Sequence, residues 1–152
     1  MESDSLITRI VKSSRLMRAT YDEFISRAAE ECDLTRPEAD VLLFLYNNPT
    51  LNTAHDAARY RGFSKAYVSR AVEPLVKRGM ISVVPDPADR RRQLLSITGG
   101  AAAAQRLHAA QRSFLALLMH GIPRDDIDRF LEVSERMCRN IAEYSARNDP
   151  DT

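Results

Sequence analysis

The stretch SKAYVSRAVEPLVKRGMISVVPDPADRRRQLLSIT, residues 64–98, decides the fold. Ser64 is a favourable N-cap for a helix that ends at Gly79, a common residue just past helix ends. The apolar side of this helix has the spacing of a core-facing stripe: Val68, Ala71, Val72 and Leu75. Two β-rich segments follow at Met80–Val84 and Gln93–Ile97, and the Pro, Asp and Arg residues between them are typical of an exposed hairpin loop. The stretch therefore predicts a helix followed directly by a β-hairpin.

The residues before this stretch predict two more helices. Thr35-Arg36-Pro37-Glu38 has the form of a capping box, and the apolar run Val41–Tyr46 behind it indicates a helix buried on most sides. Thr53 caps a short helix that begins at Ala54 and is broken by Gly62. Two short helices joined by a glycine-containing turn form a helix-turn-helix, and a hairpin behind it is a wing. We therefore expect a winged helix-turn-helix lobe over residues 35–98.

Long helices are predicted on both sides of the lobe. Apolar residues recur at helical spacing over residues 5–32, and further helices are expected over 101–118 and 124–145, with residues 148–152 frayed. These helices carry more apolar surface than one small lobe can cover, which is typical of a face that binds a partner. The expected fold class is mainly α with a small β-hairpin wing. Residues 1–152 would form one unit, in which residues 5–32 and 99–147 make a helical dimerisation region.

The net charge of +1 hides an uneven distribution along the chain. Residues 59–92 carry 9 basic and 3 acidic side chains, whereas residues 1–58 carry 6 and 10 and residues 99–152 carry 7 and 8. A basic segment between acidic flanks suits a polyanion partner such as nucleic acid, although a solvated basic face would look the same. No apolar run approaches the ~20 residues of a membrane span. The acidic, polar N-terminus is unlike a signal peptide, so we expect a cytoplasmic location.

The face opposite the apolar stripe of the helix that Ser64 caps is a candidate DNA-reading surface. Recognition helices read bases mainly with their N-terminal half, where Arg and Lys can pair with guanine edges and an Ala or Tyr contact suits a thymine methyl. The candidate residues are Ser64, Lys65, Ala66, Tyr67, Ser69 and Arg70. Pro74 follows this half, and its ring is expected to kink the helix or open one turn. A solvated amphipathic helix without a ligand would show the same pattern.

The hairpin loop is a more specific signal than the helix. Asp89, Arg90, Arg91 and Arg92 place three cations together on a thin exposed loop. The carboxylate of Asp89 could hold the guanidinium of Arg91 by a bidentate pair and so pre-aim it. A pre-aimed arginine on a thin loop suits a narrow minor groove of DNA.

Three stretches resemble the MarR family of multiple-antibiotic-resistance-type regulators: residues 34–42, residues 64–70 with 77–81, and residues 86–98. The third, DPADRRRQLLSIT, is very similar to the family's wing signature, and the helix order fits nearly the whole chain. The resemblance implies a bacterial homodimer whose terminal helices intertwine and whose two winged lobes straddle a pseudo-palindromic operator in double-stranded DNA. It also implies that Arg91 is the minor-groove arginine and Asp89 its orienting acid.

The same resemblance implies how the protein would be regulated. It would be a repressor released by a small-molecule effector, often aromatic or phenolic in this family, bound between the dimerisation helices and the lobe. The residues expected to line that site are Met17, Arg18, Tyr21 and Tyr46. Three features depart from the family pattern: Pro74 in the recognition helix, the shifted glycines Gly99-Gly100, and Cys32, which does not occupy the N-terminal position used by the peroxide-sensing branch.

No catalytic or cofactor-binding pattern is present in the sequence. The three histidines, His55, His108 and His120, have no metal-ligand spacing with each other or with Cys32 and Cys138. There is no P-loop, dinucleotide-binding or GxSxG motif either, so we expect neither an enzyme nor a cofactor. The alternative to a DNA-binding regulator is a winged-helix module for protein contacts or scaffolding. The two cysteines are expected to be reduced, partly buried thiols, with peroxide sensing as the alternative.

Overall fold

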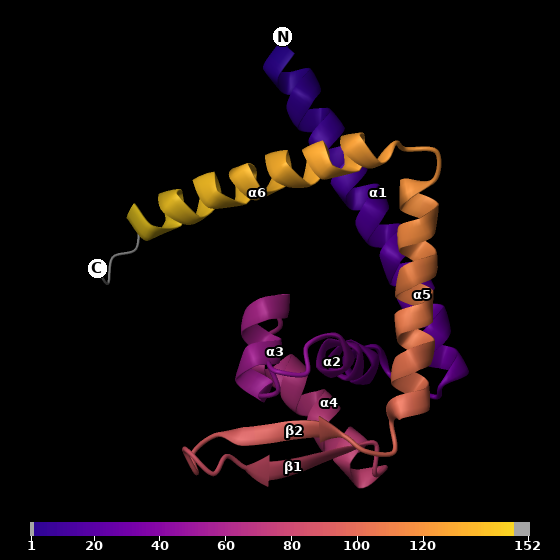
Figure 1. Cartoon of the computed structure of the whole chain (residues 1–152), viewed down its shortest axis with the longest axis vertical. Coiled ribbons are helices and arrows are strands. Elements are labelled where there is room, and N and C mark those ends of the chain that lie inside the picture. Colours follow the sequence, from indigo (N-terminus) through magenta and orange to yellow (C-terminus); the bar gives the residue numbers. More distant parts are fainter. Residues whose placement is uncertain (1, 148–152) are drawn as a thin grey trace. The chain divides into compact units, whose positions relative to one another are not determined.

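The computed structural model describes residues 2–147, and the side chains of residues 5–147. The expectation that residues 148–152 fray lies outside the described residues. The helices of the described part are α1 (Glu2–Glu31), α2 (Arg36–Asn47), α3 (Ala54–Arg61), α4 (Lys65–Lys77), α5 (Ala101–Met119) and α6 (Arg124–Arg147). Strands β1 (Ile81–Pro85) and β2 (Gln93–Ile97) form one antiparallel hairpin (Figure 1). The predicted fold class, mainly helical with a small β-hairpin wing, is confirmed.

Two compact units make up the chain, and they divide within α5, between Phe114 and Leu115. The first unit contains α1 to α4, the hairpin and most of α5. The second contains the end of α5 and helix α6.

Side-chain caps fix where the helices of the lobe begin. Thr35 forms the predicted capping box, and Thr53, predicted only as a cap, forms one as well. In each, the threonine hydroxyl accepts from the third backbone N–H of the helix and the acid at that position accepts from the threonine N–H. The Ser64 hydroxyl accepts from the N–H of Tyr67 at 3.1 Å and begins α4. Because these caps satisfy donors that a first turn leaves free, α2, α3 and α4 start where the sequence predicts.

Helix α4 remains α-helical through Pro74 as far as Lys77. It closes with the glycine motif that the sequence predicts. The N–H of Gly79 (φ +69°) donates to the carbonyl of Val76 at 2.9 Å, and the N–H of Met80 donates to that of Leu75 at 2.9 Å. These two hydrogen bonds end the helix and turn the chain directly into β1.

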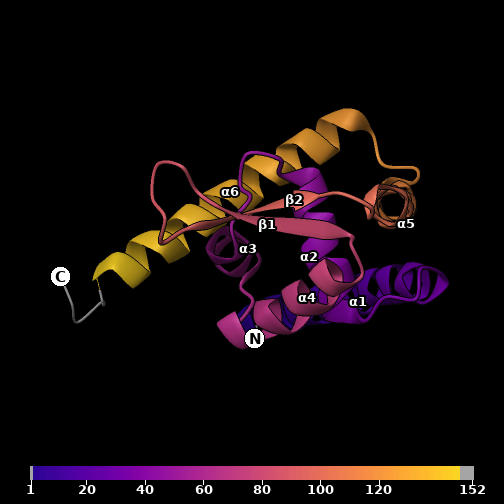
Figure 2. The ribbon, with the colours of Figure 1, turned by 90° about the horizontal axis from the view of Figure 1, so that it is seen from below.

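The hairpin that follows α4 is the predicted wing. Its register runs from the pair Ile81 and Ile97 to the pair Pro85 and Gln93. The backbone at Thr53, just before α3, forms a bridge with Leu94 and so ties the wing to the helix-turn-helix. The loop between the strands extends past α3 in both Figure 1 and Figure 2.

The core of the first unit lies between α2, α4 and parts of α1 and α5. Its largest fully buried side chains are Ile25, Val41, Leu42, Leu43, Val68, Leu75 and Leu107. Each contributes roughly 1.5–3 kcal/mol by leaving water. Phe114 of α5 makes edge contacts with Tyr21 and Phe24 of α1, with ring centroids 5.3 and 6.0 Å apart. The second half of α1 therefore packs with α5 beside the lobe.

Two helix segments leave apolar side chains exposed. In the first half of α1 these side chains are 46–66% exposed: Leu6, Ile7, Ile10, Val11 and Leu16. Helix α6 has no buried residue, and six of its large apolar side chains are 45–70% exposed: Phe130, Leu131, Val133, Met137, Ile141 and Tyr144. Among the described residues, no helix has both the length and the apolar character needed to cross a membrane.

Candidate DNA-binding site

Four of the candidate residues on α4 share an exposed outer face of the first unit. Lys65, Ala66, Ser69 and Arg70 are all exposed, while the opposite side of α4 buries Val68, Ala71 and Leu75 in the core. The core fixes which side of the helix faces outward. Side chains that can pair with base edges or contact a thymine methyl thus stand together in the N-terminal half of the helix.

Tyr67 is placed differently from the other candidates on α4. It is partly buried, its ring lies 4.8 Å from that of Phe63, and its hydroxyl donates to Asp40 at 2.6 Å. Burial, then the hydrogen bond to Asp40 and the charge of that carboxylate, raise the pKa of Tyr67, so the hydroxyl stays a donor. Its polar end is directed into the lobe rather than outward.

The wing loop is ordered by two aspartates. Asp89 accepts from the backbone N–H of Arg91 at 3.0 Å, and Asp86 accepts from that of Ala88 at 2.9 Å. The prediction that Asp89 binds the guanidinium of Arg91 by a bidentate pair was therefore wrong, because Asp89 binds the backbone N–H of Arg91 instead. The short side chain of an aspartate binds the backbone N–H two residues ahead more readily than it binds the distant end of an arginine side chain, because the backbone bond closes a compact turn. Arg90, Arg91 and Arg92 are exposed.

A basic groove joins the wing to the helix-turn-helix. It has a volume of about 510 Å³ and is lined by Thr53, Ala54, His55, Lys65, Arg91, Arg92 and Gln93. The positive end of α3 and three cationic side chains face this groove, an arrangement that complements a phosphate group. The groove residues at the start of α3 were not among the candidates from sequence. The cap at Thr53 marks a helix N-terminus, but nothing in the sequence indicates that the wing folds beside it.

Two of the expected effector residues, Tyr21 and Tyr46, lie along a chain of polar contacts among α1, α2 and α5. Tyr21 of α1 accepts from Gln111 of α5 at 3.2 Å, and Gln111 accepts from Asn47 of α2 at 2.8 Å. Asn47 also contacts His108 at 2.9 Å, and the His108 ring lies 5.2 Å from that of Tyr46. A polar chain thus connects Tyr21 with the neighbourhood of Tyr46 across three helices.

The two remaining effector candidates precede Tyr21 on α1. Met17 is partly buried and Arg18 is exposed. A separate cavity of about 270 Å³ reaches Tyr46 from the wing side, between the end of α2 and β2. The structure therefore connects Tyr21 to His108 through hydrogen bonds and His108 to Tyr46 through a ring contact, and it places Met17 and Arg18 one turn before Tyr21 on α1.

The two cysteines differ in their surroundings. Cys32 is partly buried, and burial followed by the negative charge of Glu31 raises the pKa of its thiol. A raised pKa lowers the fraction of reactive thiolate. Cys138 lies exposed on α6. Within the described residues, no group of three or more His, Cys, Asp and Glu side chains could hold a metal ion.

Comparison with known proteins shows which family this lobe resembles. Residues 33–92 match the model of the MarR family, and no protein with a curated description matches the sequence. The crystal structure of a MarR family transcription regulator has 21% identity and a TM-score of 0.73, with 97% of each chain covered.

Two further solved structures have the same fold. A variant of S. aureus MepR bound to an oligodeoxyribonucleotide has 19% identity and a TM-score of 0.52, covering 90% of this chain and 96% of that one. Bordetella bronchiseptica BpsR, whose DNA binding is regulated by 6-hydroxynicotinic acid, has 20% identity and a TM-score of 0.59, covering 84% and 98%. The predicted resemblance is therefore confirmed over the lobe: residues 33–92 match the MarR family, and the chain has the fold of solved MarR family transcription regulators.

Proposed function

We propose that this protein is a sequence-specific DNA-binding transcription regulator that acts as a homodimer in the bacterial cytoplasm. The observation that carries the proposal is the exposed face of α4 together with the arginine-rich wing loop, on either side of one basic groove. The lobe over residues 35–98 would bind DNA. Residues 5–32 and 99–147 would form the dimer. The DNA-bound MepR variant supports DNA as the partner of this fold.

The site suggests a division of labour within each lobe. Arg70 and Lys65 on α4 would contact base edges in the major groove, and Arg91 on the wing loop would enter the adjacent minor groove. The groove between them would hold the phosphate backbone. Base contacts specify the sequence, whereas phosphate contacts position the protein.

The exposed apolar faces support the dimer. Helix α6 and the first half of α1 present large side chains that one chain leaves exposed, and a second copy of the same chain would cover them. A twofold dimer would place its two recognition helices in half-sites about one helical turn apart, or a multiple of that, on a pseudo-palindromic operator.

We further propose that the protein is a repressor released by a small molecule. The support is the hydrogen-bonded chain that links Tyr21 with the surroundings of Tyr46, because a ligand inserted there would have to rearrange contacts among α1, α2 and α5. The regulation of BpsR by 6-hydroxynicotinic acid supports an effector of this size. Met17 and Arg18 would line the same region.

The test begins with a footprint on DNA upstream of the protein's own gene, repeated with candidate aromatic effectors. The operator found in this way is then used in anisotropy titrations at two salt concentrations. Arg70→Ala should lose affinity mainly for the operator, by roughly 1–3 kcal/mol. The difference in affinity between operator and random DNA should therefore become smaller. Lys77→Ala is the matched control, because Lys77 is an exposed cation in the last turn of the same helix.

Two outcomes would contradict the proposal. If Arg70→Ala weakens operator and random DNA equally, α4 does not read sequence. If an insertion of about five base pairs between the half-sites leaves binding unchanged, the two lobes do not bind one face of the duplex. A protein-interaction module would instead show no DNA binding that falls steeply with salt.

A further inference from the structure

We infer that Tyr67 is a positioning residue that ties the DNA-reading half of α4, through Asp40 and Arg36, to helix α1. The inference rests on the proposed DNA-binding function, and it assigns Tyr67 a role other than base contact. It also gives α1, a helix outside the winged lobe, a direct physical connection to the recognition helix.

The connection begins at a buried carboxylate. The side chain of Asp40 on α2 is only 3% exposed, and the Tyr67 hydroxyl donates to its Oδ2 at 2.6 Å. The Nε of Arg36 donates to the two oxygens of the same carboxylate at 3.0 and 3.1 Å. A buried carboxylate needs such partners, because leaving it unpaired away from water is costly. Tyr67 and Arg36 are therefore held by one acid.

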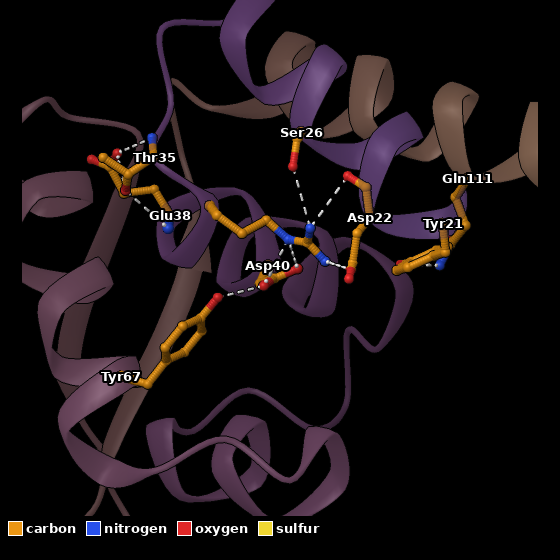
Figure 3. Close-up of polar contacts among 9 residues, drawn as sticks. Tyr21, Asp22, Ser26, Thr35, Glu38, Asp40, Tyr67 and Gln111 are labelled. Atoms are coloured by element: carbon orange, nitrogen blue, oxygen red, sulfur yellow. Dashed lines mark hydrogen bonds and ion pairs between the residues drawn. The ribbon is translucent and has the colours of Figure 1, made fainter. Parts of the chain in front are cut away.

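The connection continues from Arg36 to α1. The Nη2 of Arg36 donates to the Asp22 carboxylate at 2.8 Å, and Nη1 lies 3.4 Å from both the Asp22 carbonyl and the Ser26 hydroxyl. Figure 3 shows Asp22 and Ser26 of α1 on one side of Asp40 and Tyr67 on the other. Because a guanidinium is planar and rigid, a shift of α1 at Asp22 is passed to the position of Asp40.

The far end of α4 is held by a second acid of α2. Arg78, which caps the end of α4, lies 3.6 Å from the buried Glu38 and donates to the carbonyl of Asp33 at 2.8 Å. The recognition helix is thus attached to α2 at both ends. The attachment at Tyr67 leads on to Asp22 within α1, whereas Arg78 binds the carbonyl of Asp33 just after α1 ends.

The position of Tyr67 in the sequence makes the attachment relevant to recognition. Lys65, Ala66, Ser69 and Arg70 all lie within three residues of it. Hydrogen bonds to base edges weaken steeply when donor and acceptor are misaligned. The orientation of the N-terminal half of α4 therefore decides how well its side chains reach the bases. A tether at Tyr67 fixes that angle before DNA arrives.

Amide hydrogen exchange in the free protein tests the tether without DNA. Tyr67→Phe removes only the hydroxyl, and it should speed exchange over residues 67–71 by roughly fivefold or more, since a hydrogen bond to a charged group is lost. Asp22→Asn should speed exchange in the same segment by a smaller factor, although Asp22 lies on α1. Glu23→Gln is the control, because Glu23 pairs only along α1 with Arg27 in the contacts seen, at 3.0 Å. Unchanged exchange in both Tyr67→Phe and Asp22→Asn would overturn the inference.

Operator titrations test whether the tether matters for recognition. Tyr67→Phe should weaken operator binding about three- to tenfold, and Asp22→Asn should weaken it less, with random DNA little affected in both. The double variant should lose no more than Tyr67→Phe alone, because both changes break one connection. Losses that multiply, or an Asp22→Asn variant indistinguishable from Glu23→Gln, would overturn it. If the wild-type protein binds no DNA, the proposed function fails, while the exchange measurement still decides on the tether.

Discussion

Helices α2 and α6 both carry large apolar side chains, yet they use them differently. Helix α2 buries most of its residues, and Leu42 at its centre has no exposed surface. Helix α6 has no buried residue, and Phe130 on its apolar side is 59% exposed. The charged side chains differ as well. The acids of α2 are buried and partnered by Arg36 and Arg78, whereas α6 pairs Arg124 with Asp128 on its surface.

The difference separates two sources of stability. The apolar side chains of α2 are covered within its own unit, so the lobe gains its free energy of folding from one chain. The apolar side of α6 remains open in the single chain, so it would contribute only when a second molecule covers it. A change in α2 should therefore alter melting, and a change in α6 should alter assembly.

The largest effect is expected from a charge placed on the open face of α6. Phe130→Glu should dissociate the dimer, because an aromatic contact is lost and a carboxylate is buried in its place. The change occurs twice in a symmetric dimer, so we expect a loss on the order of 4 kcal/mol or more. Sedimentation velocity at low micromolar concentration should show the wild type at about twice the monomer mass and the variant at the monomer mass.

Arg139→Gln is the matched control for this experiment. It makes the net charge more negative by the same amount, but Arg139 lies on the opposite, polar side of α6. It should leave the dimer intact. A wild-type protein that sediments as a folded monomer would remove the dimer proposal altogether.

The next effect is expected in the core of the lobe. Leu42→Ala should destabilise the protein by about 2–5 kcal/mol, because it removes a fully buried side chain and leaves a cavity. Calorimetry should show a lower Tm, while sedimentation still shows the dimer mass at temperatures where the variant is folded. A variant that becomes monomeric without a fall in Tm would mean that α2, and not α6, carries the assembly.

The same comparison explains what could be predicted from the sequence. The starts of α2 and α3 depend on residues close together in the chain, such as Thr35 with Glu38, so local patterns were sufficient. The hairpin was predicted because turn-forming residues separate two β-rich segments. The exposed stripe on α6 was visible as helical spacing of apolar residues.

The contacts within the site were not predicted, since they join distant residues. Asp40 and Tyr67 are 27 positions apart, and Asp22 and Arg36 are 14 apart. Periodicity placed Tyr67 on the flank of the outward face, where a small rotation decides between solvent and interior. One signal was present: an acid within the apolar run of α2 has to find a partner.

A smaller effect is expected in the wing. Arg91→Ala should weaken operator binding by roughly 1–3 kcal/mol, the scale of one well-placed groove contact, and should leave the Tm unchanged because Arg91 is exposed. Arg129→Ala on α6 is the control, since it removes an exposed arginine outside the lobe. Equal losses of affinity in the two variants would show that Arg91 contributes only net charge.

The smallest effect is expected from Asp89, and the structure changes the reason for it. Its carboxylate accepts from the backbone N–H of Arg91 at 3.0 Å, so it shapes the turn and leaves the guanidinium of Arg91 free for DNA. Asp89→Ala should therefore loosen the loop and weaken operator binding by less than Arg91→Ala, by about 0.5–1 kcal/mol, the usual net contribution of one hydrogen bond.

The partner residue in the loop makes this prediction sharper. Asp86 closes a similar turn onto Ala88, but its carboxylate also lies 4.0 Å from Arg92. Asp89→Asn keeps an acceptor for the backbone N–H, so it should bind the operator nearly as well as the wild type. Removing a negative charge near DNA should itself raise the affinity, and Asp86→Asn measures the size of that charge effect. If Asp89→Asn weakens binding as much as Asp89→Ala, charge rather than turn geometry matters at this position, because a neutral amide would then fail where it can still close the turn.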